Sequence, residues 1–283
     1  MDGQTVEEAK ETFGEWIGAM LQSMHRKGYR APAIRRVYIP KPGKQEKRPL
    51  GVPTVSDRAL QRSAAQVLSA IFEQDFLPCS FGGRPGRGAH HALATLVEVV
   101  AGGKTGWVLE ADLKNFFGSL NHEWLARFVE HRVGDLRLIS LIRRWLKAGI
   151  LEDGEIHPND EGTPRGGSIS VLLSNLYMHH VLDLWFERVV KPRLRGEACL
   201  VRYIDDFVVC FPISRGRSAL PGCSVQTTGE VRPHPRIDQD QTGRIRPVRA
   251  AARGQARQEA PGNDLISGLH AVLRAQPTRQ LQG

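Results

Sequence analysis

The sequence predicts an α+β fold in which helices pack against short antiparallel strands. Two observations support this prediction, and a third limits how far along the chain it extends. Apolar residues recur at helical spacing in several segments, as they do in amphipathic helices. Short apolar runs bounded by glycine, proline or aspartate are typical of strands. After Phe211 the composition changes, since every Trp, Tyr, Phe and Lys of the 283-residue chain lies at or before that residue.

Helical periodicity marks a series of segments, and side-chain caps mark where several of them begin. The expected helices span residues 5–28, 56–72, 89–100, 121–132, 135–148 and 168–190. Thr5 and Glu8 form a capping-box pattern, and Asn121 and Asp135 each precede a helix. Pro192 is expected to end the last helix, because proline has no N–H to donate.

Strand patterns occur at a basic hairpin, at a buried run and around a pair of aspartates. They cover residues 37–53, 107–113, 199–203 and 207–211. Asp112 comes near the end of the buried run, and Ile204, Asp205 and Asp206 form the expected turn between the last two strands. Because strand ends can lie side by side in an antiparallel sheet, we expect Asp112 to approach the aspartate pair.

The net charge of the chain is +9, from 39 Lys and Arg against 30 Asp and Glu. Such an excess favours a polyanionic partner such as nucleic acid, because each Lys or Arg near a phosphate releases a condensed counterion. A basic surface that serves only solubility is the alternative interpretation of the charge.

The four cysteines, Cys79, Cys199, Cys210 and Cys223, form no CxxC pair and have no zinc-site spacing. We therefore interpret them as reduced thiols of a cytoplasmic protein. The N-terminus lacks the pattern of a signal peptide, and no apolar run is long enough to cross a membrane. The sequence thus predicts no membrane partner.

Three aspartates in this arrangement would suit the transfer of a nucleotide to a 3′-hydroxyl. That reaction uses two hard cations, which activate the hydroxyl and stabilise the departing pyrophosphate. Mg²⁺ prefers carboxylate oxygens and keeps several waters, so two or three aspartates suffice to hold it. An isolated Asp-Asp pair is more often a solvated turn, so its meaning depends on the surrounding motifs.

Several blocks in a fixed order resemble group II intron-type reverse transcriptases. Fingers-like blocks are residues 37–42 (VYIPKP), 48–53 (RPLGVP), 57–61 (DRALQ) and 80–87 (SFGGRPGR). Residues 112–117 (DLKNFF) are similar to polymerase motif A, residues 162–170 (GTPRGGSIS) to motif B, and residues 203–206 (YIDD) to motif C. Departures from the family pattern are Gly83, Gly118, Arg165 and Val171, and none of them removes an expected metal ligand.

The resemblance implies the fingers and palm of a right-hand polymerase, with an antiparallel palm sheet and packed helices. Residues 1–105 would form a fingers-like region and residues 106–211 the palm with motifs A, B and C. Residues 212–283 form a low-complexity tail that we expect to be mostly disordered, because its composition buries little apolar surface. A thumb is not recognisable, so the expected activity of this chain is impaired.

The resemblance also implies roles for individual residues. Asp112, Asp205 and Asp206 would be the catalytic residues and the ligands of two Mg²⁺ ions, for which Mn²⁺ is a substitute. Phe117 would lie under the sugar and exclude a 2′-hydroxyl, with a core phenylalanine as the alternative.

Four further residues are expected to bind the dNTP. Arg48 and Arg84 would reach its triphosphate, since guanidinium binds phosphate in a bidentate way. Gly166 and Gly167 would let the incoming base approach closely, with a simple helix-capping loop as the alternative.

The function implied by the resemblance is RNA-directed DNA synthesis. Its partners would be an RNA template, a DNA or RNA primer, dNTPs and intron RNA. Two alternatives stay open at this stage: a non-catalytic, RNA-binding maturase-type splicing factor, and a reverse transcriptase associated with defence or CRISPR systems. The aspartates favour synthesis, because RNA binding alone does not require them.

Overall fold

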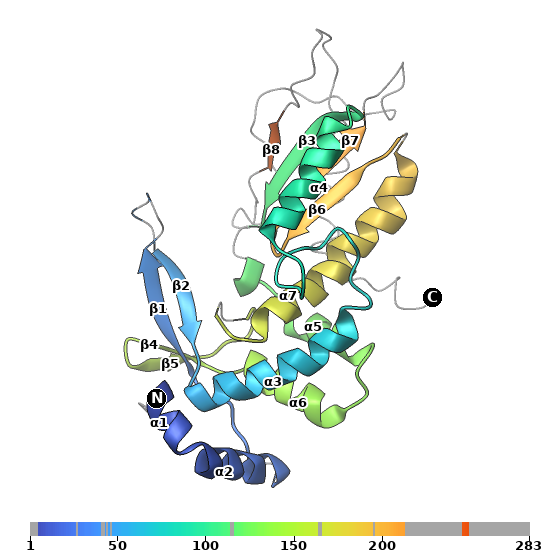
Figure 1. Cartoon of the computed structure of the whole chain (residues 1–283). Helices are drawn as coiled ribbons and strands as arrows, with labels where there is room; N and C mark the ends of the chain where they lie inside the picture. Colours follow the sequence, from blue (N-terminus) through green and yellow to red (C-terminus); the bar gives the residue numbers. More distant parts are fainter. Residues whose placement is uncertain are drawn as a thin grey trace, which may run out of the picture. The chain divides into compact units, whose positions relative to one another are not determined.

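The computed structural model of the chain describes residues 5–26, 28–40, 43, 45, 47–113, 116–163, 166–194, 196–212 and 245–248 (Figure 1). The chain divides into two compact units, each discontinuous in sequence. Unit 1 combines the residues up to Asp75 with Phe116–Leu176, and unit 2 combines Phe76–Asn115 with the residues from Tyr177 onward. The predicted boundary between fingers and palm at residue 105 divides the chain differently and stays a prediction about function.

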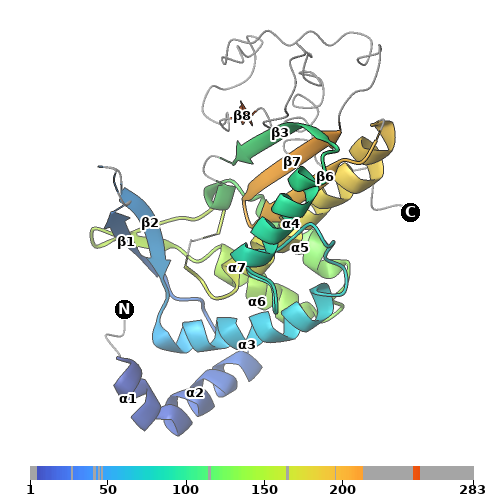
Figure 2. The ribbon, with the colours of Figure 1, turned by 45° about the horizontal axis from the view of Figure 1, so that its top comes forward.

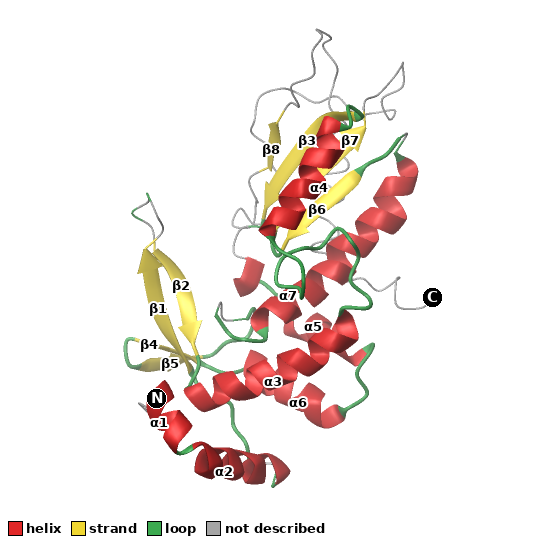
Figure 3. Cartoon of the chain, viewed as in Figure 1, coloured by secondary structure: helices red, strands yellow, loops and turns green. Residues whose placement is uncertain are grey.

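Unit 1 contains most of the helices and a mixed sheet (Figure 3). Its helices are α1 (Val6–Glu11), α2 (Phe13–His25), α3 (Val55–Phe72), α5 (His122–Glu130), α6 (Leu136–Leu146) and the start of α7 (Ser170–Met178). Its strands are β1 (Ile34–Pro40), β2 (Lys47–Val52), β4 (Ile150–Glu152) and β5 (Glu155–His157), in the order β2-β1-β4-β5. β1 and β2 form the predicted antiparallel hairpin, whereas β1 and β4 run parallel.

The predicted caps are confirmed, and one predicted helix is two helices. Thr5 and Glu8 form both halves of the capping box at α1, and Asn121 and Asp135 accept main-chain N–H groups at the starts of α5 and α6. The single helix predicted over residues 5–28 is interrupted at Thr12, whose hydroxyl donates to the Glu8 carbonyl at 2.9 Å. Such side-chain bonds to the main chain compete with helical geometry and bend helices.

The buried face of α3 differs in part from an all-apolar stripe. Its buried residues include Asp57 and Gln61 as well as Leu68, whereas Val67 is 58% exposed. Polar residues are tolerated on this face because Gln61 Nε2 donates to Asp57, and Asp57 also accepts from Trp145 Nε1 of α6. Thr54 caps this helix, and its side-chain hydroxyl accepts from Asp57 N at 3.3 Å.

Unit 2 consists of an antiparallel sheet with helices beside it, visible in both orientations (Figure 1 and Figure 2). Its strands β3 (Thr105–Asp112), β6 (Cys199–Tyr203), β7 (Asp206–Pro212) and β8 (Ile245–Val248) have the order β6-β7-β3-β8. α4 (Ala89–Ala101) packs against β6, where Ala92 meets Phe81 and Val201 in a small core. The predicted antiparallel sheet and α+β class are confirmed.

The helix that enters unit 2 from α7 changes its winding. It continues as two π-helical segments, His179–Asp183 and Phe186–Val190, and then as a 3₁₀ turn, Lys191–Arg193. Pro192 lies in that last turn, and the helix ends there as predicted. Within the described part of the chain, no helix is both long and apolar enough to cross a membrane.

The tail lies almost entirely outside the described residues. Its prediction of disorder therefore stays a prediction, except at Ile245–Val248, where the structure has the strand β8. β8 pairs with the edge of β3, with Val108 opposite Val248. An open strand edge offers unpaired N–H and C=O groups, which explains why it accepts a further strand.

Candidate active site

The sheet of unit 2 brings the candidate carboxylates together at one end. Asp112 is the last residue of β3, Asp206 is the first of β7, and the two are direct partners across the ladder. The Cα atoms of such partners lie about 4.5–5.5 Å apart in antiparallel sheets. Asp205 precedes Asp206 in the turn, so the three backbone positions are clustered as the sequence predicts.

The turn between β6 and β7 is tighter than predicted and has an unusual backbone. Tyr203 pairs with Asp206, so the loop consists of Ile204 and Asp205 alone, and Asp206 belongs to the strand. Ile204 has a φ of +60°, whereas Asp205 is not among the residues with positive φ. This is the pattern of a type II′ turn, whose first position is normally glycine. A β-branched residue with positive φ is strained and persists only where its surroundings hold it.

Exposure follows the turn geometry. Asp205 is half-buried and Asp206 is exposed, whereas the next residue, Phe207, is 2% exposed and belongs to the core. The apolar strand thus fixes the backbone from below while the aspartates lie at its surface end. This arrangement presents carboxylates to solvent on a rigid base.

A loop before α4 covers the turn. A Cβ atom added to Gly82 would lie 2.6 Å from Cγ1 and 2.8 Å from the main-chain nitrogen of Ile204. The loop also bonds to β6, since Phe81 N donates to the Arg202 carbonyl at 2.9 Å and Arg202 N donates to the Cys79 carbonyl at 2.8 Å. The glycine in the predicted fingers block is therefore required by close approach to the turn.

Arg202 is a residue that the sequence reasoning missed. It is fully buried in β6, and its guanidinium donates to both carboxylate oxygens of Asp183, at 2.8 and 2.7 Å. It also donates to the Ser80 hydroxyl and to the Ile204 carbonyl, each at 2.8 Å. The signal was present in the sequence, because an arginine within the apolar run 199–203 is costly unless it is paired.

Arg84 has a setting different from the one predicted for a dNTP ligand. It is 7% exposed, and its guanidinium donates to the carbonyls of Leu77 and Ser80, each at 2.8 Å. Its guanidinium carbon also lies 5.3 Å from the centre of the Phe76 ring. Through these contacts Arg84 stabilises its own loop. Its contact with a triphosphate stays a prediction.

The other predicted dNTP residues belong to unit 1. Arg48 is exposed on β2, and Phe117 is half-buried, with its ring edge-to-face against that of Phe116 at 5.5 Å. Phe116, at 4% exposed, is the core phenylalanine of the two.

The glycine loop before α7 has features of both interpretations given to it. Gly166 has a φ of +107°, and a Cβ there would lie 2.6 Å from the Gly51 carbonyl oxygen, so this position requires glycine. The Gly167 carbonyl accepts from Ser170 N at 3.1 Å, which is a helix-starting contact. The dNTP role of both glycines stays a prediction.

The chemistry of the donor set fits a divalent cation. Asp112, Asp205 and Asp206 supply carboxylate oxygens, the ligands that Mg²⁺ prefers. No cluster of three His, Cys, Asp or Glu side chains arranged for a metal occurs among the side chains that the structure describes, and these do not include that of Asp112. The fit therefore depends on residue type and on the register of β3 and β7.

Comparisons with known proteins identify the family of this chain. Residues 39–221 match the model of the family described as reverse transcriptase (RNA-dependent DNA polymerase). The group II intron-encoded protein LtrA of Lactococcus lactis subsp. cremoris is 34% identical over 189 residues, which are 65% of this chain and 31% of LtrA. Protein YkfC of Escherichia coli (strain K12) is 37% identical over 172 residues, 60% of this chain and 45% of YkfC.

Among solved structures, telomerase from Candida albicans bound to a fragment of telomeric RNA is similar, with a TM-score of 0.49 and 12% identity, over 74% of this chain and 43% of that one. The chain spans less than half the length of LtrA and of YkfC. The family match begins within β1 and extends past the aspartate turn, so the chain belongs to the reverse transcriptase family, and its similarity to LtrA supports the predicted group II intron type.

Proposed function

We propose that the chain is an RNA-directed DNA polymerase that adds dNTPs to a primer on an RNA template. The observation that carries this proposal is the pairing of Asp112 with Asp206 across β3 and β7, next to Asp205 in the turn. A general RNA-binding surface has no need of carboxylates, which repel phosphate. Their convergence at a sheet end therefore favours catalysis over binding alone.

The proposed role of the three aspartates is to bind two Mg²⁺ ions, with Mn²⁺ as a substitute. Such ions, when bound, assist attack by the primer 3′-hydroxyl and stabilise the departing pyrophosphate. The protein's own contribution is orientation. β3 and β7 fix the backbone of Asp112 and Asp206, and the two-residue loop fixes that of Asp205.

Unit 1 supplies the residues proposed to select the dNTP. Arg48 is exposed and positively charged, which suits contact with a triphosphate. The ring of Phe117 would pack under the sugar and disfavour a 2′-hydroxyl, and Gly166 with Gly167 would allow the base to approach. The proposed contact of Arg84 with the triphosphate has less support than that of Arg48, because the Arg84 guanidinium already donates to main-chain carbonyls.

The proposed nucleic-acid partners are an RNA template with its primer, and intron RNA. The net charge of +9 and the likeness to a group II intron-encoded protein support them. The same features would serve a maturase-type role without synthesis, so the test has to separate the two.

The test is primer extension on poly(rA)/oligo(dT) with Mg²⁺ or Mn²⁺, with RNA binding measured in parallel. Asp205→Asn is expected to lower incorporation by at least about 1000-fold, because a metal ligand supplies several kcal/mol and each factor of ten is about 1.4 kcal/mol. RNA binding should be retained. The matched control is Asp153→Asn, at an exposed aspartate in the turn between β4 and β5, outside the proposed site.

Two results would contradict the proposal. If the parent chain binds RNA but incorporates no dNTP under either metal, a maturase-type role is favoured. If Asp205→Asn and Asp153→Asn incorporate dNTP equally well, the aspartate turn is not the catalytic site.

A further inference from the structure

We infer that Arg202 is a positioning residue for the aspartate turn, acting through the main-chain carbonyl of Ile204. Its effect on synthesis rests on the proposed function, whereas its effect on the turn does not. The residues that support this inference, Cys79–Gly82, Asp183 and Arg202–Asp206, all belong to unit 2.

Arg202 is connected directly to the aspartate turn. Arg202 Nη1 donates to the Ile204 carbonyl oxygen at 2.8 Å, and that carbonyl belongs to the peptide that leads into Asp205. Because this peptide is held in place, the backbone of Asp205 is held as well, and with it the starting point of the Asp205 side chain. The same guanidinium is bound at its other edge to Asp183 by two hydrogen bonds, so its own orientation is fixed.

Burying the Arg202–Asp183 ion pair costs desolvation free energy. Arg202 and Asp183 are both 0% exposed, and burying two charges is favourable only where geometry and additional hydrogen bonds are good. Apolar residues of the same volume would stabilise the core at least as well. A pair that contributes little net stability but reaches the catalytic turn is better explained by positioning.

The aspartate turn needs support from its surroundings, because its backbone is strained at Ile204. Ile204 is a β-branched residue at a φ of +60°, a conformation that an isolated hairpin would avoid. Two contacts hold it there: the Arg202 guanidinium at its carbonyl, and the backbone of Gly82 against its side chain and nitrogen. Removing the first contact should let the peptide between Ile204 and Asp205 rotate.

The two side chains that anchor Arg202 are those of Asp183 and Ser80, and each is held in its own segment. Asp183 ends the π-helical segment His179–Asp183, and π-helical turns are frequent at functional sites. Ser80, which accepts from Arg202 Nη2, lies in the loop held by the guanidinium of Arg84. Arg84 thus stabilises the loop that contains Ser80, and Arg202 connects this loop to the aspartate turn.

The test uses the full chain and two variants. Arg202→Lys keeps the charge but cannot make four directed hydrogen bonds. The double variant Arg202→Met/Asp183→Leu removes the buried pair without leaving an unpaired charge, so it is expected to fold. The control is Lys104→Met/Glu197→Leu, which removes an exposed ion pair of the same unit, with side chains 74% and 80% exposed.

Three readouts are used, two of which do not require synthesis. They are amide hydrogen exchange of the peptide covering residues 200–208, Mn²⁺ binding measured by electron paramagnetic resonance, and kcat and KM for dTTP in primer extension. For the double variant we expect faster exchange at the turn and Mn²⁺ affinity about tenfold weaker. We expect kcat lower by about 10- to 100-fold, with KM changed by less than about twofold.

The outcomes separate this inference from the proposed function. Faster exchange and weaker Mn²⁺ binding in both variants support the positioning role even if the parent makes no DNA, a result that would count against the proposed function alone. A folded double variant with parental exchange at 200–208 and parental Mn²⁺ affinity overturns the inference. So does a double variant that merely melts earlier and keeps the parental kcat at a temperature where it is folded.

Discussion

Both compact units bury a carboxylate in a hydrogen-bonded network, and the two networks differ in what they hold. In unit 1, Asp57 is 3% exposed and accepts from Tyr29 Oη, from Trp145 Nε1 at 3.2 Å and from Gln61 Nε2 at 3.0 Å. These donors are uncharged. In unit 2, Asp183 is 0% exposed and accepts from the charged guanidinium of Arg202.

A buried carboxylate with hydrogen-bonded partners therefore serves a different purpose in each unit. The Asp57 network joins α3 to α6 and to the segment before β1, and among the described side chains its hydrogen bonds reach none of the predicted catalytic residues. The Asp183 network continues through Arg202 to the carbonyl of Ile204. Breaking the first network should therefore change stability alone, and breaking the second should change catalysis.

The largest expected change in stability follows from Asp57→Ala. It leaves the donors of Tyr29 and Gln61 buried without their acceptor, at about 1–3 kcal/mol each, whereas Trp145 Nε1 still donates to Tyr29 Oη at 2.9 Å. We therefore expect a loss of about 2–6 kcal/mol in the free energy of unfolding. Urea unfolding measures it, and kcat well below the unfolding midpoint should stay at the parental value.

Asp57→Asn is the matched control, because it keeps the shape and one acceptor oxygen and should lose about 1–2 kcal/mol. A fall in kcat for Asp57→Ala as large as that for the Arg202 variants would abolish the distinction between the two networks.

A smaller, pH-dependent effect is expected at His179, which packs near the second network. Burial lowers the pKa of His179 to about 4, and the positive charges of Arg202, Arg188 and Arg84 act in the same direction. The native state thus binds a proton less readily than the unfolded chain, whose histidine has a pKa of about 6.5. This contribution to stability is complete above about pH 6.5 and is lost as the pH falls toward about 4, by about 2–3 kcal/mol.

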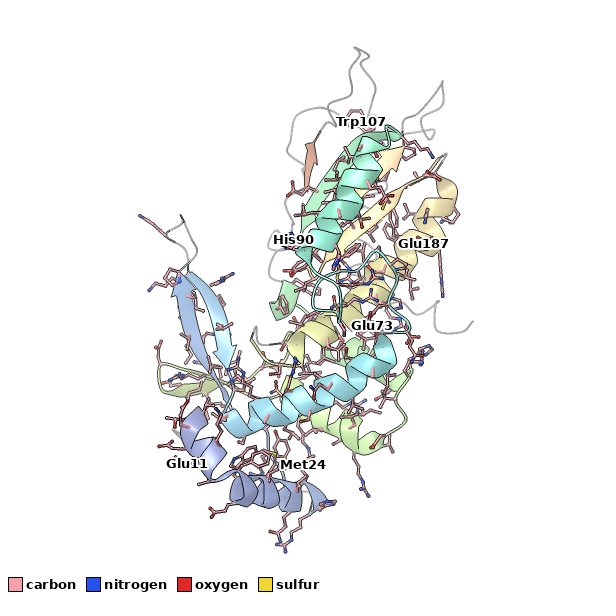
Figure 4. The ribbon with its side chains drawn as sticks, viewed as in Figure 1. Glu11, Met24, Glu73, His90, Trp107 and Glu187 are labelled. Atoms are coloured by element: carbon pink, nitrogen blue, oxygen red, sulfur yellow. The ribbon has the colours of Figure 1, made fainter. Side chains whose placement is uncertain are left out.

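Thermal unfolding between pH 4 and 7 measures this effect. His179→Leu should unfold with a weaker pH dependence than the parent, whereas the control His90→Gln, exposed near the start of α4 (Figure 4), should leave the dependence unchanged. If His179→Leu and the parent lose stability in parallel over this range, the buried histidine is not the cause.

Much of the fold followed from local sequence signals. The capping residues, the basic hairpin and the aspartate turn are short-range patterns, and the structure has each of them. The break at Thr12 was missed because helical periodicity continues across it, while the cause is one hydroxyl bond to Glu8. The polar face of α3 was missed because an apolar-stripe rule does not count buried Asp57 as a core residue.

The candidate site was predictable in its carboxylates but not in its supports. Asp112 and Asp206 come from motifs, and their pairing follows from strand order. Arg202 lies on β6 and Asp183 in the π-helical segment His179–Asp183, and only the fold makes them partners. Arg84 was read from a motif as a phosphate ligand, yet its burial against the Leu77 carbonyl depends on loop geometry that spacing does not carry.

The smallest expected effect tests the second contact on the turn. Gly82→Ala would place a Cβ 2.6 Å from Ile204 Cγ1 and 2.8 Å from its main-chain nitrogen, so loop or turn has to shift. We expect a loss of about 1–3 kcal/mol in unfolding free energy, the usual range of overpacking costs, and faster amide exchange at residues 200–208. Gly134→Ala is the control, because nothing lies within 4 Å of its added Cβ. Since Arg202 still holds the Ile204 carbonyl in this variant, its kcat should fall less than that of the Arg202 variants. Parental exchange at the turn in Gly82→Ala would mean that the loop gives way instead, and that Arg202 alone supports Ile204.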